Sequence, residues 1–330
     1  MTAMLELRGV SKRFVRGLDA AERVANLLGA HRTEQVVHAV DGVDLAIRKG
    51  EVVGLVGESG CGKSTLGRIA VGLLEACAGE RLWHGHSFAT MSADATRQAR
   101  LAIQMIFQDA YASLNPRMRV QDIIGEAPRV HGLVSRGEEE DYVARLMQRV
   151  GLDASFARRY PHQFSGGQRA RIGIARSLAV KPEFLVCDEA VAALDVSIAA
   201  QVLNLFIELR EELGLTYLFI SHDLGVVRHL SDRVVIMYLG RVLETAPSDE
   251  LFRAPNHPYT QALLAEVPNL DRRKRTYQPI AGDLPSPLDP PGGCHFHPRC
   301  PNAMPRCKIE RPTLRNIAPG RSSACHLNDS

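Results

Sequence analysis

A glycine-rich stretch at residues 57–65, GESGCGKST, constrains the fold of this chain more than any other feature. It fits the pattern G-x-x-x-x-G-K-[ST], in which backbone N–H groups and a helix N-terminus surround a phosphate group. Residues 52–56 before it form a short apolar, β-branched run typical of a buried parallel strand, and residues 64–74 after it read as a helix. A strand, a glycine loop and a helix in this order predict a nucleoside-triphosphate site.

Every residue of this phosphate loop is a candidate ligand of the nucleotide. Lys63 can reach the β- and γ-phosphates, and the Ser64 hydroxyl can ligate Mg²⁺. Cys61 lies among N–H groups that create a positive field, so we expect its thiol to be reactive, with a lowered pKa. The candidates are Gly57, Glu58, Ser59, Gly60, Cys61, Gly62, Lys63, Ser64 and Thr65.

Length and composition limit the class of protein. A chain of 330 residues has room for one large α/β domain and a smaller appendage. A net charge of +3 is too small to indicate nucleic-acid binding, and no apolar run approaches the length of a membrane span. The charged N-terminus lacks a signal-peptide core. We therefore expect a cytosolic chain that reaches a membrane only through a partner and does not bind nucleic acid.

Further short apolar runs read as strands of the same parallel sheet, at residues 103–107, 184–187 and 216–220. Residues 234–244 look like a hairpin, and Leu and Val residues at helical spacing predict an amphipathic helix inside an insert at residues 16–36. The sequence does not indicate what the insert does. The predicted fold class is α/β.

Polar residues follow three of these strands. Asp188 closes an apolar strand, where a carboxylate can hold Mg²⁺, and Glu189 comes next, at the strand tip, where it can face an attacking water. Gln108 and His222 also stand just beyond strands. Taken singly, each of these has an ordinary structural alternative, either a strand-end turn or a structural histidine.

The middle of the chain changes character. Residues 109–178 are charged, helix-rich and broken by glycine and proline, which predicts a helical subdomain inserted into an α/β core at residues 1–265. Within it, the sequence FSGGQR at residues 164–169 places two glycines at the start of a new helix. Residues 266–330 form a C-terminal extension rich in proline, glycine and cysteine that would need an external staple to hold a shape.

Together these motifs, in this order and spacing, resemble the ATPases of ABC type, and the Ser-Gly-Gly-Gln signature is the specific element. The resemblance implies an ATP-hydrolysing enzyme with an ABC ATPase core. It implies that ATP would lie with its adenine near Phe14, whose ring can stack on the base; the alternative is that Phe14 is a core residue. The implied catalytic residues are Glu189, His222, Lys63 and Gln108, and the implied Mg²⁺ ligands are Ser64, Gln108 and Asp188. The site of a facing subunit would be completed by Ser165, Gly166, Gly167, Gln168 and Asp195.

Three further stretches are similar to the oligopeptide/dipeptide importer family, and to the second of its two ATPase subunits: QMIFQDAYASLNPRM (104–118), LDVSIAAQVLNL (194–205) and GGCHFHPRC (292–300). The family implies a subunit at the cytoplasmic face of the inner membrane that powers peptide import. Its implied partners are a homologous ATPase subunit in a heterodimer, two permease subunits and a substrate-binding protein. The alternatives are a nickel or glutathione importer, and a soluble ABC ATPase acting on nucleic acid or ribosomes.

Four of the seven cysteines crowd the C-terminal extension, namely Cys294, Cys300, Cys307 and Cys325. In a reducing compartment this crowding suggests a metal site rather than disulfides. The spacing C-x5-C-x6-C-x17-C lacks the close pairs of structural zinc sites and suits an iron–sulfur cluster better. The family resemblance also implies a [4Fe-4S] cluster on this extension, with zinc or unmetallated cysteines as the alternatives.

Overall fold

A parallel β-sheet forms the centre of the computed structural model, which describes residues 3–29, 31, 33–109, 111–266 and 282–329. Its five parallel strands are buried almost throughout, so each reads as a continuous apolar run rather than an alternating one. In the order in which they pair, they are β9 (Arg233–Tyr238), β3 (Val52–Val56), β8 (Thr216–Ile220), β7 (Phe184–Asp188) and β6 (Ile103–Ile106).

Antiparallel strands extend this sheet beyond β9. The predicted hairpin is present, with β10 (Arg241–Pro247) paired to β9. The C-terminal strands β12 (Arg321–Ser323) and β11 (Arg315–Ala318) continue the sheet from β10. These two strands join the tail to the main sheet through backbone hydrogen bonds, and the need for an external staple remains a prediction.

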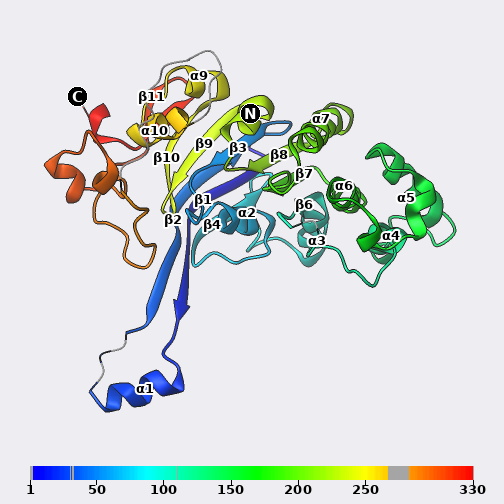
Figure 1. Cartoon of the computed structure of the whole chain (residues 1–330), viewed down its shortest axis with the longest axis horizontal. Helices are drawn as coiled ribbons and strands as arrows, with labels where there is room; N and C mark the ends of the chain where they lie inside the picture. The colour runs from blue at the N-terminus through cyan, green and yellow to red at the C-terminus, as the bar shows by residue number, and fades with distance from the viewer. Residues whose placement is uncertain (1–2, 30, 32, 110, 267–281, 330) are drawn as a thin grey trace.

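A second, antiparallel sheet has the strand order β2–β1–β4–β5. The long strands β1 (Leu5–Arg16) and β2 (Gln35–Ile47) project from the body as a two-stranded arm with helix α1 (Ala20–Leu27) at its tip (Figure 1). The arm thus contains the helix predicted between residues 16 and 36. The remaining strands of this sheet are β4 (Ala78–Trp83) and β5 (His86–Ser87).

Helices cover both sheets. Helix α2 (Lys63–Val71), which follows the phosphate loop, contacts β7 and β8 of the central sheet as well as β1 and β2 of the second sheet. Buried apolar side chains of α2 and of both sheets form one core cluster, which fixes the start of α2 against the end of β3. The other helices of this body are α3 (Ala93–Ala102), α7 (Val196–Leu213), α8 (Leu224–Leu230), α9 (Ser248–Arg253) and α10 (Pro258–Glu266).

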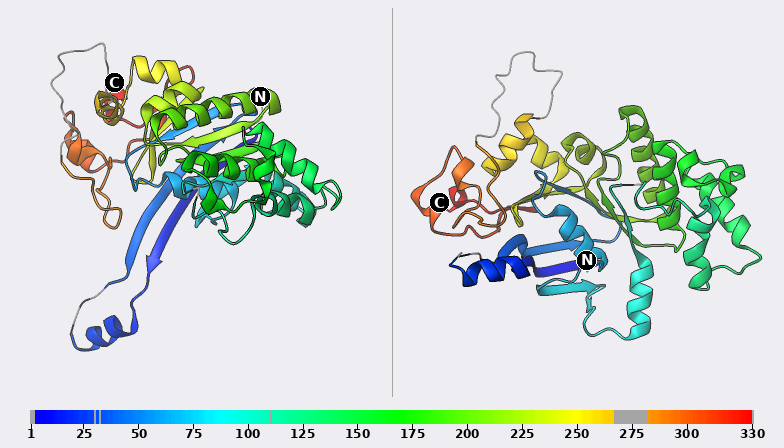
Figure 2. Two further views of the ribbon diagram at one scale, coloured as in Figure 1. Left: turned by 45° about the vertical axis from the view of Figure 1, so that its right-hand side comes forward. Right: turned by 60° about the horizontal axis from the view of Figure 1, so that its bottom comes forward.

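The region predicted as a helical subdomain is helical and lies beyond the β6 edge of the central sheet (Figures 1 and 2). It is on the side away from residues 282–329, here called the C-terminal segment. Its elements are α4 (Val120–Val130), α5 (Glu139–Arg149), α6 (Gly166–Leu178) and the 3-10 turns η1 (Ala154–Arg158) and η2 (Pro161–Gln163). The limits assigned to this subdomain and to the two domains remain predictions.

The C-terminal segment packs on the β9–β10 hairpin. Phe296, which is 1% exposed, meets the ring of Tyr238 edge-on with 5.5 Å between centroids, and it also contacts Tyr259. Buried Glu244 on β10 accepts hydrogen bonds from two backbone N–H groups of the α9–α10 connection. Short 3-10 turns complete the segment: η3 (His297–Arg299), η4 (Pro305–Lys308) and η5 (His326–Asn328).

Candidate nucleotide site

The phosphate loop is shaped by close backbone approaches that only glycine permits. A Cβ atom at Gly57 would collide with the carbonyl oxygen of Met237, and one at Gly62 would collide with that of Ala39. Gly62 also has φ 104°, a left-handed conformation that other residues rarely adopt. These constraints bring the loop close against its neighbours and start α2 directly at Lys63.

The Lys63 side chain is buried in the loop. Its ammonium group donates hydrogen bonds to the carbonyl oxygens of Gly57 at 2.7 Å and of Glu58 at 2.9 Å. The third donor of the ammonium group lies 3.9 Å from the Cys61 sulfur, a weak contact that an anion held by the loop can replace. The predicted position of Lys63 within a phosphate cradle fits this geometry.

A pair of oxygen-bearing side chains stands beside the loop. The Ser64 hydroxyl, in the first turn of α2, donates to Oδ1 of Asp188 at 2.8 Å. Burial raises the pKa of the Asp188 carboxyl, and the hydrogen bond from Ser64 opposes that rise. A hydroxyl and a carboxylate in contact at the carboxyl end of β7 are oxygen donors of the kind that Mg²⁺ prefers.

Residues that follow three strands converge on Glu189. Gln108, after β6, donates from Nε2 to Oε2 of Glu189 at 2.7 Å, and Nδ1 of His222, after β8, lies 3.4 Å from Oε1. Glu189 has φ 48°, a conformation uncommon for a non-glycine residue, and its backbone N–H donates to the Ile220 carbonyl. The structure thus joins three predicted catalytic residues in one group.

A cavity of about 320 Å³ connects the loop to this group. Phe14, which is 43% exposed, lies on its wall, so the alternative that Phe14 is a core residue is wrong. Three lining residues, Val37, Ala39 and Pro287, were not predicted, because isolated apolar residues and a tail proline carry no recognisable motif. The other lining residues are Ser59, Gly60, Gly62, Lys63, Ser64, Thr65, Gln108 and Glu189.

The expectation that Cys61 is reactive is wrong. Its side chain is 1% exposed and belongs to the core cluster beneath the loop. Burial raises the pKa of the Cys61 thiol, and the nearby charge of Lys63 does not overcome that effect. The thiol therefore points into the protein rather than toward a phosphate.

This placement predicts the outcome of cysteine labelling. In the folded protein, iodoacetamide should modify exposed Cys77 at least about tenfold faster than Cys61, because Cys61 is buried and burial raises the pKa of its thiol. Mass spectrometry of tryptic peptides at successive times measures the two rates, and labelling in denaturant serves as the control. Rapid modification of Cys61 that Mg-ATP blocks would contradict the buried placement.

The residues predicted to act on a facing subunit lie apart from this cavity. Ser165 caps α6, with its hydroxyl accepting from the Gln168 N–H while the Gln168 side chain accepts from the Ser165 N–H. Ser165, Gly166 and Asp195 are exposed, and among the described residues none of the predicted trans set (Ser165, Gly166, Gly167, Gln168, Asp195) lines the cavity. The signature helix thus presents its N-terminus to solvent.

The iron–sulfur prediction is wrong. Within the described part of the chain, which contains Cys294, Cys300, Cys307 and Cys325, no group of three His, Cys, Asp or Glu residues could hold a metal ion. Burial raises the pKa of Cys294 to about 11 and also raises the pKa values of Cys300 and Cys325. Cys294 and Cys307 are buried in the apolar cluster around Tyr238 and Phe296, and Cys300 packs against it. The zinc alternative fails because it needs the same metal-binding group.

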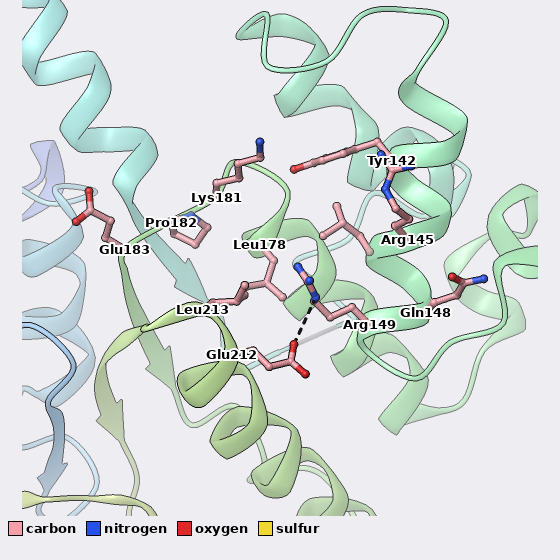
Figure 3. Close-up of a pocket in the computed structure, with 11 residues that line it drawn as sticks. Tyr142, Arg145, Gln148, Arg149, Leu178, Lys181, Pro182, Glu183, Glu212 and Leu213 are labelled. Atoms are coloured by element: carbon pink, nitrogen blue, oxygen red, sulfur yellow. Dashed lines mark ion pairs between the residues drawn. The ribbon is translucent and has the colours of Figure 1, made fainter.

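A larger cavity of about 860 Å³ lies between the helical region and the far end of the central sheet (Figure 3). Arg145 and Arg149 project from α5, while Lys181 and Glu183 precede β7. Arg149 pairs with Glu212 at 3.7 Å. This cavity adjoins the amino end of β7, whereas the phosphate loop and Glu189 follow the carboxyl ends of their strands, so the two are separate sites.

The phosphate loop, the carboxylates of Asp188 and Glu189 and the exposed N-terminus of α6 are together the features of an ABC-type ATPase. The family model "ABC transporter" matches residues 40–192, and the model "Oligopeptide/dipeptide transporter, C-terminal region" matches residues 243–307. The chain belongs to the ABC transporter family as an ATP-hydrolysing, ATP-binding subunit of the oligopeptide/dipeptide group.

Individual proteins similar to this chain support the same family assignment. The chain is 53% identical over 295 residues to the oligopeptide transport ATP-binding protein AppF of Bacillus subtilis (strain 168), covering 88% of this chain and 90% of that protein. The ATP-binding cassette MJ0796, solved as a dimer in a post-hydrolysis state with ADP and Pi, is 27% identical with a TM-score of 0.62, covering 74% of this chain and 99% of that one. The protein cbiO1 of Clostridium perfringens, part of the ABC transporter complex cbiONQ, has the same TM-score at 26% identity, covering 77% of this chain and 92% of that one. No described helix of the present chain is long and apolar enough to cross a membrane.

Proposed function

We propose that this chain hydrolyses ATP to power the import of peptides through a membrane permease. The observation that carries the proposal is the convergence of Gln108 and His222 on Glu189, beside the phosphate loop. The peptide cargo is supported by the match to the oligopeptide/dipeptide C-terminal region and by the role of the relative AppF in oligopeptide transport. The same relationship favours peptides over nickel, glutathione or a soluble role on nucleic acid.

The donor set beside the loop fits Mg²⁺. Ser64, Gln108 and Asp188 offer a hydroxyl, an amide oxygen and a carboxylate, all of them hard oxygen ligands. When bound, Mg²⁺ would neutralise charge on the phosphates. The hydrogen bond between Ser64 and Asp188 already brings two of these groups together.

In this proposal the loop N–H groups and Lys63 hold the β- and γ-phosphates, and Phe14 stacks on the adenine. Glu189 orients the lytic water and accepts its proton while the water oxygen bonds to the γ-phosphorus. The bond from the γ-phosphorus to the β–γ bridging oxygen breaks, giving ADP and inorganic phosphate. His222 donates a hydrogen bond to the γ-phosphate, and Gln108 keeps Glu189 in place.

A single chain supplies only part of each proposed site. The exposed N-terminus of α6, with Ser165 at its cap, would complete the site on a facing subunit by adding a hydroxyl and a helix N-terminus near the γ-phosphate. Resemblance to the second of two ATPase subunits favours a homologous chain as the partner. Loss of the γ-phosphate would then remove the group that joins the two subunits and open the pair.

We place the chain at the cytoplasmic face of the inner membrane, bound to two permease subunits that receive cargo from a substrate-binding protein. This assignment rests on the family and on the role of its relatives in transport. The segment from Gln108 to Pro116 joins the Glu189 group to the helical region and suits contact with a permease. It is our candidate for the element that couples hydrolysis to transport.

The cargo can be tested directly. The chain should be co-expressed with its permease subunits and sister ATPase, purified, and assayed for ATP hydrolysis with the substrate-binding protein loaded with peptides, Ni²⁺ or glutathione. We expect ATP hydrolysis to be stimulated only by the substrate-binding protein loaded with peptides. Stimulation by Ni²⁺ or glutathione, with none by peptides of two to five residues, would overturn the peptide assignment.

A further inference from the structure

The C-terminal segment lines part of the nucleotide cavity, although it lies far from the phosphate loop in the sequence. Pro287 lies on the cavity wall with Phe14 and Val37. The Pro287 carbonyl accepts a hydrogen bond at 3.0 Å from the N–H of His38 on β2, which fixes the segment to the arm at this point. Part of the cavity wall therefore comes from Pro287, which lies beyond the predicted ATPase core.

A second contact joins this segment to the phosphate loop itself. The Arg299 guanidinium donates two hydrogen bonds to the Glu58 carboxylate, at 2.7 and 3.0 Å, in the bidentate geometry that makes such pairs strong. The Arg299 side chain is 7% exposed and that of Glu58 is 23% exposed, so solvent screens the pair only weakly.

Glu58 is bound through its main chain as well. Its N–H donates to the hydroxyl of Tyr259 at 3.0 Å, and its carbonyl oxygen accepts from the Lys63 ammonium at 2.9 Å. A single loop residue thus connects Arg299, Tyr259 and the lysine proposed to hold the phosphates. A shift of the Glu58 backbone would move the acceptor that places Lys63.

Arg299 has little freedom to move. It ends the η3 turn, and its N–H donates to the carbonyl of Phe296, whose ring packs against Tyr238 and Tyr259. The guanidinium also lies 3.5 Å from the Tyr238 hydroxyl. A side chain held this firmly can transmit the position of the C-terminal segment to the loop.

We propose that Arg299 is a positioning residue of the nucleotide site, which holds the phosphate loop in its binding conformation through Glu58. The inference depends on the proposed nucleotide site and assigns the C-terminal segment a role in it. Nucleotide affinity then depends on whether this segment is docked. A partner that pulls the segment away would weaken ATP binding by releasing Glu58 and by removing Pro287 from the cavity wall.

The test measures binding of a fluorescent ATP analogue with Mg²⁺ to the full-length chain. Arg299→Ala should raise the Kd about tenfold, because removing one partner of a buried charged pair leaves the other without compensation. Arg299→Lys, which keeps the charge but not the bidentate geometry, should fall between Arg299→Ala and wild type. Arg306→Ala is the matched control, since this exposed arginine of the same segment pairs with Glu310 and Asp329 rather than with the loop.

A double-mutant cycle separates positioning from general stability. Glu58→Ala should raise the Kd by a similar factor, and the Glu58→Ala, Arg299→Ala double variant should be no weaker than either single variant. Should Arg299→Ala fail to fold, the Glu58→Ala variant still decides the question. Wild-type affinity in Glu58→Ala, or effects of the two changes that multiply, would overturn the role of Arg299.

The same assay tells this inference apart from the nucleotide site on which it depends. Lys63→Ala should abolish binding. If it does so while the Arg299 and Glu58 variants bind normally, only the positioning role fails. If Lys63→Ala also binds normally, the proposed nucleotide site is wrong.

Discussion

Replacing Glu189 by Gln should slow ATP hydrolysis by about 10³-fold, in the range that loss of a general base causes. The side chain keeps its size and can still contact Gln108 and His222, but an amide cannot take a proton from water. Nucleotide binding should persist, because the loop and Lys63 are unchanged, and the variant should accumulate in an ATP-bound, paired form. Phosphate release and size-exclusion chromatography with Mg-ATP measure the two effects.

The matched control is Glu183→Gln, at the opposite end of the same strand β7. Glu183 is half exposed and lies 3.7 Å from His84, remote from the phosphate loop. Its substitution should leave turnover within about twofold of wild type, as expected for a surface site. Turnover near the wild-type rate in a pure Glu189→Gln sample would remove Glu189 from the role of base.

The second prediction with a large expected effect follows because the phosphate loop and the N-terminus of α6 lie apart on this chain. In a heterodimer, Lys63→Ala should disable the site built on this chain's loop, whereas Ser165→Arg should disable the site built on the sister's loop. An arginine at the exposed cap of α6 would place a bulky side chain where the facing nucleotide must sit. Combining both changes in this chain should therefore abolish all turnover, because each of the two sites carries one lesion.

A mixing experiment distinguishes a heterodimer from a homodimer. In the absence of the sister subunit, Lys63→Ala and Ser165→Arg chains should remain inactive when combined. In a homodimer the two chains would instead complement each other and restore one intact site per pair. Robust recovery of ATPase activity in the mixture would overturn the heterodimer.

The phosphate loop and the Glu189 group could be predicted because their chemistry is local in sequence. The glycine spacing predicts a phosphate loop directly. Polar residues that follow apolar strands lie close together when those strands are parallel neighbours, as β6, β7 and β8 are. Pro287 and Arg299 could not be predicted in this way. The Arg299–Glu58 pair spans 241 positions, and neither residue belongs to a motif that would show the other as its partner.

For the cysteines, by contrast, the sequence led to a prediction that is wrong. Four thiols crowded in one segment suggested a metal, but clustering in sequence does not show how side chains are oriented or solvated. Cys294 and Cys307 are buried and pack with Phe296 and Tyr238 as small apolar residues, a common role for free cysteine. The tail also pairs with the main sheet through β11 and β12, whose backbone hydrogen bonds its composition did not reveal.

ATP-driven uptake of a labelled peptide into proteoliposomes tests the central claim most directly. The vesicles would contain the permease, this chain and its sister subunit, with ATP on the side of the ATPases and the peptide-loaded binding protein on the other. We expect peptide to accumulate with wild-type chain and Glu183→Gln, and not with Glu189→Gln. Accumulation that persists with Glu189→Gln, or that never exceeds ATP-free vesicles with wild-type chain, would contradict the account.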